Sequence, residues 1–431
     1  GKSEADLPSL PDMACETSLA IVRIATSSMS ALYLSGYNMV SFVLIMRIIN
    51  LTLNKGIAQD TPLWFTYYSV GLSSFFQFEK SMKYGRLAMA MMERKQARKV
   101  EVRVIHGFNS YTRHWLEPLR DTLPALLEAY QKSFETGDVE FSGFSSFVYF
   151  YHGFYCGREL SGLEKDITAH IGVMRRFGLI TNLNYNLLFR QTFQNYMGLS
   201  EDPTRLFSDL YSDEEMIRVH AEARDWFGMY FIHLNRLVLR YLFGDLTGAS
   251  EDVREARRLI RYVPGSYAFV LYYFYRSLIE LSLITHGQSR AKRKKTFSKI
   301  RKSQKKLKTW AGFAPMNNLH KYHLVEAELA RIEDDPGKAA ELFDLAIQEA
   351  RDHEFLQEEA MACELAARFY IGRGQGEIAA IYLKRSHGCW NQWGAKAKVR
   401  DIETKHSGLL KTVMQDEMSV RQPVTFNASS T

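Results

Sequence analysis

The sequence is poor in proline and cysteine. Only 10 of its 431 residues are proline, which suits a mainly helical chain because proline interrupts helices. The four cysteines lie far apart and include no Cys-x-x-Cys pair, so they argue against a zinc site and against a disulfide framework. We therefore expect a reducing, cytoplasmic environment. The cysteines are Cys15, Cys156, Cys363 and Cys389.

Long uninterrupted apolar segments are also missing. The uncharged stretch 24–46 is diluted by serine, glycine and asparagine, and the aromatic stretch 268–284 contains Arg276 and Glu280. A membrane-spanning helix needs about 20 predominantly apolar residues. We therefore interpret both stretches as buried helices and expect no membrane span and no secretory signal.

Known catalytic motifs are absent as well. The sequence has no His-Glu-x-x-His, no Gly-x-Ser-x-Gly and no kinase-type catalytic loop. The acidic residues 333–335 directly precede Pro336 and lack an acidic partner one turn later, which favours a helix cap over a magnesium site. His320 and His323 share a helix face without nearby carboxylates or cysteines in sequence, a weak metal site. We predict no catalytic residues, no cofactor and no metal.

What the sequence does contain is apolar residues at helical spacing. The clearest example lies between Asp335 and Ala350, and the segments 355–370 and 378–393 repeat the arrangement. Glycines follow two of these stripes, at Gly372 and Gly394, and glycine favours a helix stop. Hairpins of this kind bury their stripes only by stacking on neighbours. The first stripe consists of Ala339, Leu342, Phe343, Ala346, Ile347 and Ala350.

The pattern predicts an all-α fold, a tetratricopeptide-like α-solenoid of stacked helical hairpins. We expect an N-terminal linker at 1–14, a helical-repeat array at 15–411 with roughly ten hairpins, and a C-terminal linker at 412–431. No segment alternates like a β-strand. The earlier candidate helices are 16–34, 37–53, 61–76, 78–95, 121–135, 163–177 and 226–243.

An aromatic run at 147–155 surrounds His152 and permits two interpretations. It could line a ligand pocket, which is the basis for an alternative function as an α-helical enzyme with an aromatic-lined pocket. The interpretation that we favour is a core helix packed between its neighbours, because large aromatic side chains are usually buried.

One segment, 290–308, is strongly basic, with eleven Lys and Arg and no acid. The whole chain has a net charge of +7, so the remainder is mildly acidic at −4. Phe297, Ile300, Leu307 and Trp310 fall on one stripe, which predicts an amphipathic helix with a cationic outer face. The candidate partner-binding residues are Lys292, Arg293, Lys294, Lys295, Lys299, Lys302, Lys305 and Lys306.

Three uses of this basic face remain open: a solvated surface, a dock for an acidic protein surface, or a site for nucleic acid or anionic lipid. Nucleic acid is an unlikely partner, because no aromatic residues for base stacking interleave with the lysines on the polar side. Protein partners or neighbouring domains of the same polypeptide fit the composition better.

The C-terminal third resembles the closing repeats of a known module. That module is the tetratricopeptide-like helical region that follows the STAND/AAA-type ATPase in large hybrid kinases, which combine a serine/threonine-kinase-like domain, the ATPase, a GAF sensor and a sensor histidine kinase. The resemblance is carried by Trp310-Ala311, Pro315, Asn317, Glu326-Ala327-Glu328, Ala330-Arg331, Ala340, Phe343-Asp344, Ala346-Ile347, Ala350, Glu364 to Tyr370, Tyr382-Leu383 and Trp393 to Val399.

The resemblance implies a non-catalytic scaffold or sensing arm of a multidomain cytoplasmic signalling protein. The phosphate loop, the catalytic loop and the phospho-accepting histidine box of such kinases have no counterpart here, so ATP binding and phosphotransfer belong to other parts of the polypeptide. We expect an extended concave surface whose occupancy biases the adjacent ATPase. The lysine density at 292–308 exceeds what the family pattern requires.

Overall fold

A computed structural model describes residues 7, 10–34, 37–92, 95–284 and 288–411. This part of the chain forms nineteen α-helices, short 3-10 helices and one pair of two-residue strands. The predicted all-α fold is confirmed. The predicted C-terminal linker, 412–431, lies outside the described residues. Within the predicted N-terminal linker, Leu7, Leu10 and Met13 are buried, and Asp12 forms an isolated parallel bridge with Ile57.

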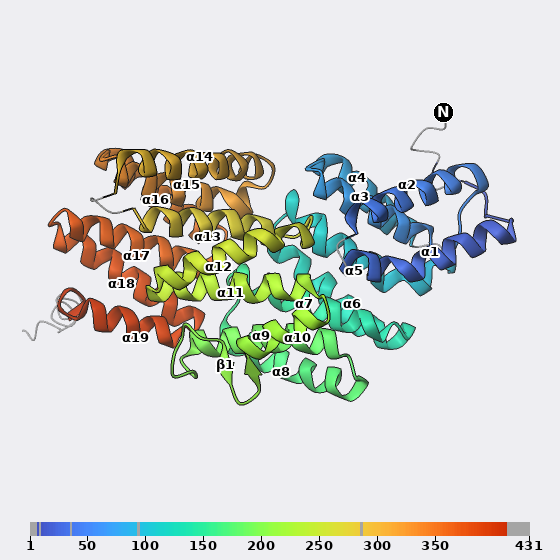
Figure 1. Cartoon of the computed structure of the whole chain (residues 1–431), viewed down its shortest axis with the longest axis horizontal. Coiled ribbons are helices and arrows are strands. Elements are labelled where there is room, and N and C mark those ends of the chain that lie inside the picture. The colour runs from blue at the N-terminus through green and yellow to red at the C-terminus, as the bar shows by residue number, and fades with distance from the viewer. Residues whose placement is uncertain (1–6, 8–9, 35–36, 93–94, 285–287, 412–431) are drawn as a thin grey trace, which may run out of the picture.

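The helices follow one another with short connections (Figure 1). The first part contains α1 (Glu16–Leu34), α2 (Asn38–Lys55), α3 (Thr61–Ser74), α4 (Phe78–Met91), η2 (Lys95–Val100), α5 (Glu101–Tyr111), η3 (Arg113–Trp115), η4 (Leu119–Asp121), α6 (Thr122–Thr136), α7 (Val139–Tyr155), α8 (Leu160–Phe177) and α9 (Ile180–Met197). The second part contains β1 (Phe207–Ser208), β2 (Tyr211–Ser212), α10 (Asp213–Glu222), α11 (Trp226–Phe243), α12 (Leu246–Leu259), η5 (Ile260–Tyr262) and α13 (Ala268–Ser282). The last part contains α14 (Arg290–Phe313), α15 (Pro315–Ile332), α16 (Pro336–Asp352), α17 (Leu356–Gly372), α18 (Gly376–Trp393) and α19 (Lys396–Lys405).

Local sequence signals set many of these boundaries. The Asp335 side chain accepts a hydrogen bond from the Lys338 N–H and caps α16, as predicted for this acidic segment. Glu159 caps α8 in the same way by accepting from two backbone N–H groups. Gly394 ends α18 in the left-handed conformation, with φ of 92°. Gly372, predicted as a stop, is instead the last residue of α17, and the left-handed glycine that follows is Gly374.

The structure contains a pair of short β-strands, although no strand was predicted from the sequence. Phe207 pairs with Ser212 and Ser208 with Tyr211 in a tight antiparallel hairpin between α9 and α10. The hairpin is stabilised by side chains of α9, because Gln191 donates to the Phe207 carbonyl and accepts from the Ser208 hydroxyl. Four residues are too few for an alternating pattern to appear in the sequence.

Segments about 200 residues apart are joined by hydrogen bonds. The Asn317 side chain bonds to the backbone of Leu119, Gln357 donates to the Tyr155 carbonyl, and Trp393 donates to the Arg158 carbonyl. The sequence separations are 198, 202 and 235 residues. The helices therefore wind so that α15–α18 return to the segments around η4 and α7. These contacts bring the C-terminal hairpins against the segment 119–158.

The buried apolar residues form one large core and three small ones. The large core extends from Phe78 to Leu410, whereas the small ones lie mainly among α1–α6. Figure 1 shows α1–α5 at one end of the elongated molecule and α14–α19 at the other. Among the described residues, no helix is both long and apolar enough to cross a membrane.

Candidate functional site

The predicted basic segment forms helix α14, which extends past 308 to Phe313. Its N-terminus is capped by the Ser289 hydroxyl, which accepts from the Lys292 N–H at 3.4 Å. Ile300, Leu307 and Trp310 are buried, as the stripe predicted. The amphipathic character of this helix is therefore confirmed, with one face packed against the body and the other facing outward.

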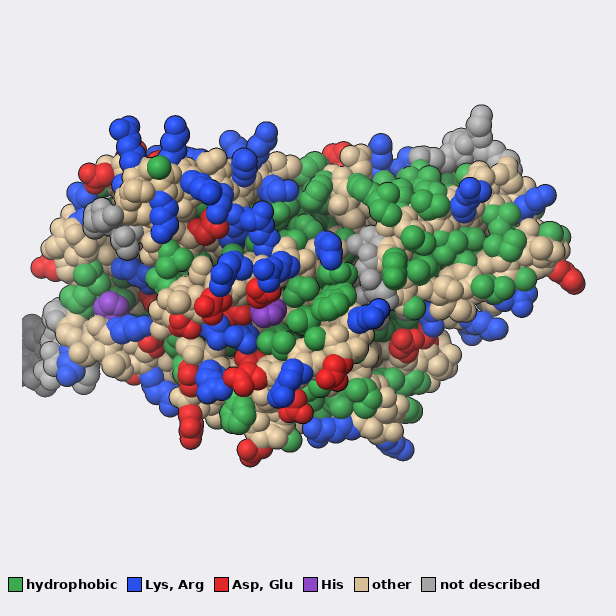
Figure 2. Space-filling view, viewed as in Figure 1, with side chains coloured by type: hydrophobic (Ala, Val, Ile, Leu, Met, Phe, Trp, Pro, Cys, Tyr) green, Lys and Arg blue, Asp and Glu red, His purple; other side chains and the backbone are tan. Residues whose placement is uncertain are grey.

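Six of the eight candidate residues are exposed and form no ion pair with any residue in the described ranges. Figure 2 shows their effect as a row of blue side chains along the edge formed by α14. We call this set the basic crest. It consists of Lys292, Lys294, Lys295, Lys299, Lys302 and Lys305.

The other two candidates have structural roles. Arg293 donates to the Ile332 carbonyl at 2.6 Å, and its guanidinium lies 5.4 Å from the centre of the Phe297 ring. The Lys306 ammonium lies 5.4 Å from the Phe76 ring and 5.2 Å from the Tyr273 ring. Both side chains are half-buried, so they help to attach α14 to its neighbours.

Two of the acidic residues 333–335 have structural partners. Glu333 pairs with Arg301 of α14 at 2.9 Å, and Asp335 caps α16. Nowhere in the described ranges do three or more His, Cys, Asp or Glu residues gather as a metal site would require. Since Arg301 also contacts Glu326 at 3.4 Å, it is the member of the basic segment whose charge is compensated.

His320 and His323, the second pair considered for metal binding, each lie beside a glutamate side chain. His323 lies 3.0 Å from a Glu349 oxygen. His320 is buried and hydrogen-bonded to Glu358, which also pairs with Lys321 at 2.6 Å. Burial lowers the pKa of His320 to about 4. The ring is therefore neutral near pH 7 and has a structural partner rather than an open coordination position.

Lys321 is the centre of a buried polar hub. Its side chain is 0% exposed, donates to the Asn317 carbonyl at 3.0 Å, and lies 4.4 Å from the Phe355 ring centre. Burial raises the pKa of Glu358, but the neighbouring Lys321 and His320 outweigh it and hold this pKa below its ordinary value. The charges therefore compensate one another inside the core, at the junction of α15 and α17.

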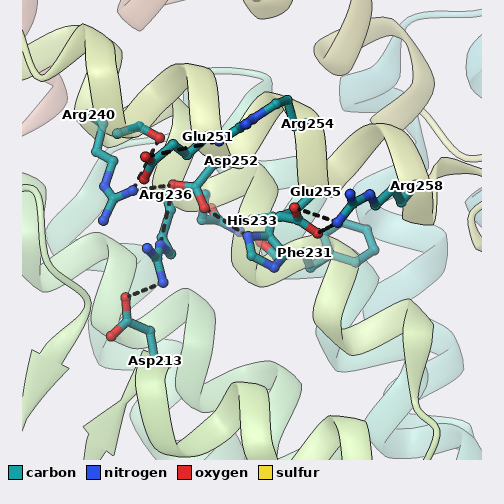
Figure 3. A network of polar contacts seen from close by, with 12 residues as sticks. Asp213, Phe231, His233, Arg236, Arg240, Glu251, Asp252, Arg254, Glu255 and Arg258 are labelled. Atoms are coloured by element: carbon teal, nitrogen blue, oxygen red, sulfur yellow. Dashed lines mark hydrogen bonds and ion pairs between the residues drawn. The ribbon is translucent and has the colours of Figure 1, made fainter.

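A second buried network ties α10, α11 and α12 together (Figure 3). Asp252 of α12 accepts from Arg240 at 2.8 Å and from Arg236 at 3.3 Å, and it lies 2.8 Å from His233 Nδ1. Arg236 also reaches Asp213 of α10 at 3.3 Å. The charged groups of this network pair with one another, so the network links the three helices inside the protein.

The aromatic run 147–155 is mainly core, as favoured from the sequence. It forms α7, and Phe150, Tyr151 and Phe154 are fully enclosed in the large core. Phe147 and Val148 of this run border an open space, a cavity of about 160 Å³. We call it the junction cavity.

Most of the junction cavity comes from segments that the sequence analysis did not single out. Phe42 of α2, Val70 of α3, His106 of α5 and Phe144 of α7 all line it. The candidate helices 37–53 and 61–76 cover Phe42 and Val70, whereas His106 lies in no predicted helix. No local signal could have grouped them, because they lie on four different helices.

The sequence shows little similarity to known proteins. No family model matches the chain. A segment of 61 residues is 38% identical to "Hybrid signal transduction histidine kinase G" of Dictyostelium discoideum, which covers 14% of this chain and 2% of that protein. The similarity to this kinase is thus confined to a small part of either chain.

Among solved structures, a circular tandem repeat protein with novel repeat topology and enhanced subunit contact surfaces aligns over 94% of this chain and 96% of its own. The identity is 13% and the TM-score is 0.21. A likeness this low supports no inference, so the all-α assignment rests on the helices and their packing.

Proposed function

We propose that this chain is a non-catalytic helical-repeat scaffold or sensing arm of a multidomain cytoplasmic signalling kinase, and that the basic crest of α14 binds an acidic surface. The acidic surface belongs to a protein partner or to a neighbouring domain such as a STAND-type ATPase. The observation that carries the proposal is the concentration of six exposed, unpaired lysines on one helix of an otherwise mildly acidic chain. The short similarity to a hybrid histidine kinase supports the signalling context.

Folding does not account for the basic crest. Lys295 and Lys299 stand four residues apart, and Lys302 follows Lys299 after three. Like charges at these spacings destabilise a helix by about 0.2 to 0.5 kcal/mol per pair. The apolar stripe and the Arg301 ion pairs hold α14 without them. The lysines of the basic crest repel one another and so destabilise α14. An acidic partner that neutralises them would account for their presence.

The test separates charge from packing. Replacing Lys294, Lys295, Lys299 and Lys302 by Gln should leave the melting temperature nearly unchanged, because exposed charges contribute little to stability. It should weaken binding of a fluorescent polyglutamate peptide by about tenfold at low salt, which corresponds to about 1.4 kcal/mol, and the effect should shrink as salt rises.

A matched control replaces four exposed lysines outside α14 by Gln and should retain the binding of the wild type. These are Lys80, Lys99, Lys165 and Lys338. Single-stranded DNA of the same charge serves as the competing probe. Equal loss of peptide binding in both variants, or tighter binding of the DNA than of the peptide, would refute a dock for an acidic protein surface.

A further inference from the structure

The junction cavity lies where the N-terminal helices meet the rest of the molecule. Its walls come from α1, α2, α3 and α5 of the N-terminal part and from α7 and α11 of the rest. Its volume is about 160 Å³. An apolar cavity of about 150 Å³ in a protein core is large enough to bind benzene. The space therefore suits a molecule built around one aromatic ring.

Several aromatic rings line the cavity. Phe42 stands edge-on to Phe75, with ring centres 5.1 Å apart, and Phe141 stands edge-on to Phe144 at 5.5 Å. Phe147 contributes a fifth ring from α7. Aromatic rings attract one another in edge-to-face and offset arrangements, which adds to the gain from apolar burial. Another ring placed among these side chains would find such contacts on several sides.

One polar group of the wall has unused hydrogen-bonding capacity. His106 is 6% exposed, and its Nδ1 lies 3.3 Å from the Ser145 hydroxyl and 3.4 Å from the Ser110 hydroxyl. Its Nε2 has no hydrogen-bond partner in the part of the chain that the structure describes. Burial lowers the pKa of His106 to about 3, so the imidazole is neutral near pH 7. A neutral imidazole nitrogen pairs with a hydroxyl or an N–H group.

The strong charge at the cavity wall is already compensated. Arg103 makes two hydrogen bonds to Asp138, at 2.6 and 3.0 Å, and its guanidinium lies 4.7 Å from the Phe141 ring centre. A carboxylate entering the cavity would lose its hydration without gaining a free cation, and burying an unpaired charge is strongly unfavourable. The cavity therefore favours a neutral ligand.

We propose that the junction cavity binds a small neutral molecule with one aromatic ring system and one polar substituent, such as phenol or indole. The ring lies among the aromatic walls and the substituent pairs with His106 Nε2. Because both sides of the junction contribute walls, the ligand stabilises the packing of α2 and α3 against α7. This site is independent of the basic crest, so a failure of either proposal leaves the other intact.

The experiment titrates the full chain with phenol, indole and benzoate at pH 7.5 and follows heat release by calorimetry. Phenol and indole should bind and raise the melting temperature in proportion to ligand concentration, whereas benzoate should not. Val70→Trp, which fills the cavity, should abolish binding. Val43→Trp, on the exposed face of the neighbouring α2, should retain it. His106→Phe should weaken phenol binding by about five- to tenfold through the lost hydrogen bond and leave toluene binding unchanged.

A second measurement keeps the test valid if a variant fails to fold. In methyl-labelled wild-type protein, phenol ring protons should show nuclear Overhauser contacts to Val70 and Met29, two residues of the cavity wall. Absence of binding at about 10 mM of either neutral ligand, weaker than a specific small-molecule site would show, overturns the proposal. So does benzoate binding as tight as that of phenol, or undiminished binding by Val70→Trp.

Discussion

The two ends of the molecule are built from similar helical hairpins but are stabilised differently. From α6 onward, the helices share one continuous core and are linked by hydrogen bonds between segments about 200 residues apart. The N-terminal helices α1–α5 have small, separate cores. In a helical array each hairpin is stabilised by its interfaces with its neighbours, and contacts between distant segments add to this in the body. The N-terminal block should therefore unfold more easily than the body.

Buried polar groups follow the same division. The body contains buried charges, such as Lys321 with Glu358 and Lys398 with Glu364 and Asp401. The N-terminal block uses neutral hydroxyls. Ser69 lies 2.8 Å from the Thr112 hydroxyl, and similar bonds between serines join α3 to α4. Neutral hydrogen bonds cost less to break than buried ion pairs, because opening them exposes no uncompensated charge.

The surfaces differ as well. Figure 2 shows hydrophobic side chains over much of the N-terminal face, while charged side chains dominate the body. Ile24 is 69% exposed and Met39 is 68% exposed. These residues add nothing to the core, so the N-terminal block derives less stability from its apolar content than its composition suggests.

The largest expected effect concerns the buried hub of the body. Lys321→Met should lower the free energy of unfolding by about 3 to 5 kcal/mol, because it leaves Glu358 buried beside a neutral histidine. Urea unfolding followed by circular dichroism measures the loss. The double variant Lys321→Met with Glu358→Leu should recover much of it, and Lys294→Met on the exposed face should be close to wild type. If Lys321→Met alone is as stable as wild type, the hub is not a stabilising element.

A matched pair of leucines tests whether the two regions unfold separately. Leu63 and Leu278 are both fully buried, one in each region. Each change to Ala should cost about 2 to 5 kcal/mol locally. Hydrogen exchange should accelerate for Leu63→Ala mainly within α1–α4, and for Leu278→Ala across the body. Uniform acceleration throughout the chain in Leu63→Ala would show that the molecule is one cooperative unit.

Acidification should destabilise the protein through buried neutral histidines. Burial lowers the pKa of His114 to about 3 and that of His320 to about 4, from an ordinary 6.5. Below pH 6.5 the unfolded chain takes up protons that the folded chain does not. Stability is thus full above pH 6.5 and is lost as the pH falls toward 4, by up to about 1.4 kcal/mol per pH unit for each such histidine.

The urea midpoint between pH 7.5 and 5 measures this dependence. His114 contributes to it because both of its ring nitrogens are buried and have no hydrogen-bond partner among the described residues. His114→Phe should make the dependence shallower, whereas the exposed His353→Gln should leave it unchanged. A midpoint that rises on acidification would contradict the neutral state of these rings.

The smallest effect is expected on the apolar surface of the N-terminal block. Ile24→Ser and Val43→Ser should each change stability by less than about 0.5 kcal/mol, because both side chains face solvent. Thermal melts of the single variants measure this. A loss above about 1 kcal/mol, the size expected for a packed side chain, would mean that these residues are covered in solution.

The sequence predicted what depends on local spacing. The stripe from Ala339 to Ala350 placed α16 almost correctly, and the apolar stripe of α14 correctly predicted the outward face for six of the eight candidate residues. The sequence could not predict the hydrogen bond of Arg293 to Ile332. Nor could it predict the contacts of Lys306 with the Phe76 and Tyr273 rings, because all of these partners lie on other segments.

The sequence also could not predict which charged side chains are buried. Lys321 lies in a polar stretch and its partner Glu358 is 37 residues away. The junction cavity requires side chains from six helices to meet, which only the tertiary packing determines. The site residues that depend on one helix were therefore predictable, and those that depend on helix assembly were not.

The bonds between segments about 200 residues apart also determine how the chain can fold as it is made. When the segment from Leu119 to Arg158 leaves the ribosome, its later partners Asn317, Gln357 and Trp393 have not been synthesised. Synthesis proceeds at about 5 to 20 residues per second, so about 10 to 40 seconds pass before these partners appear. During that interval the backbone groups of Leu119, Tyr155 and Arg158 lack the partners that they have in the folded protein, so this segment can complete its packing only after the C-terminal hairpins are made.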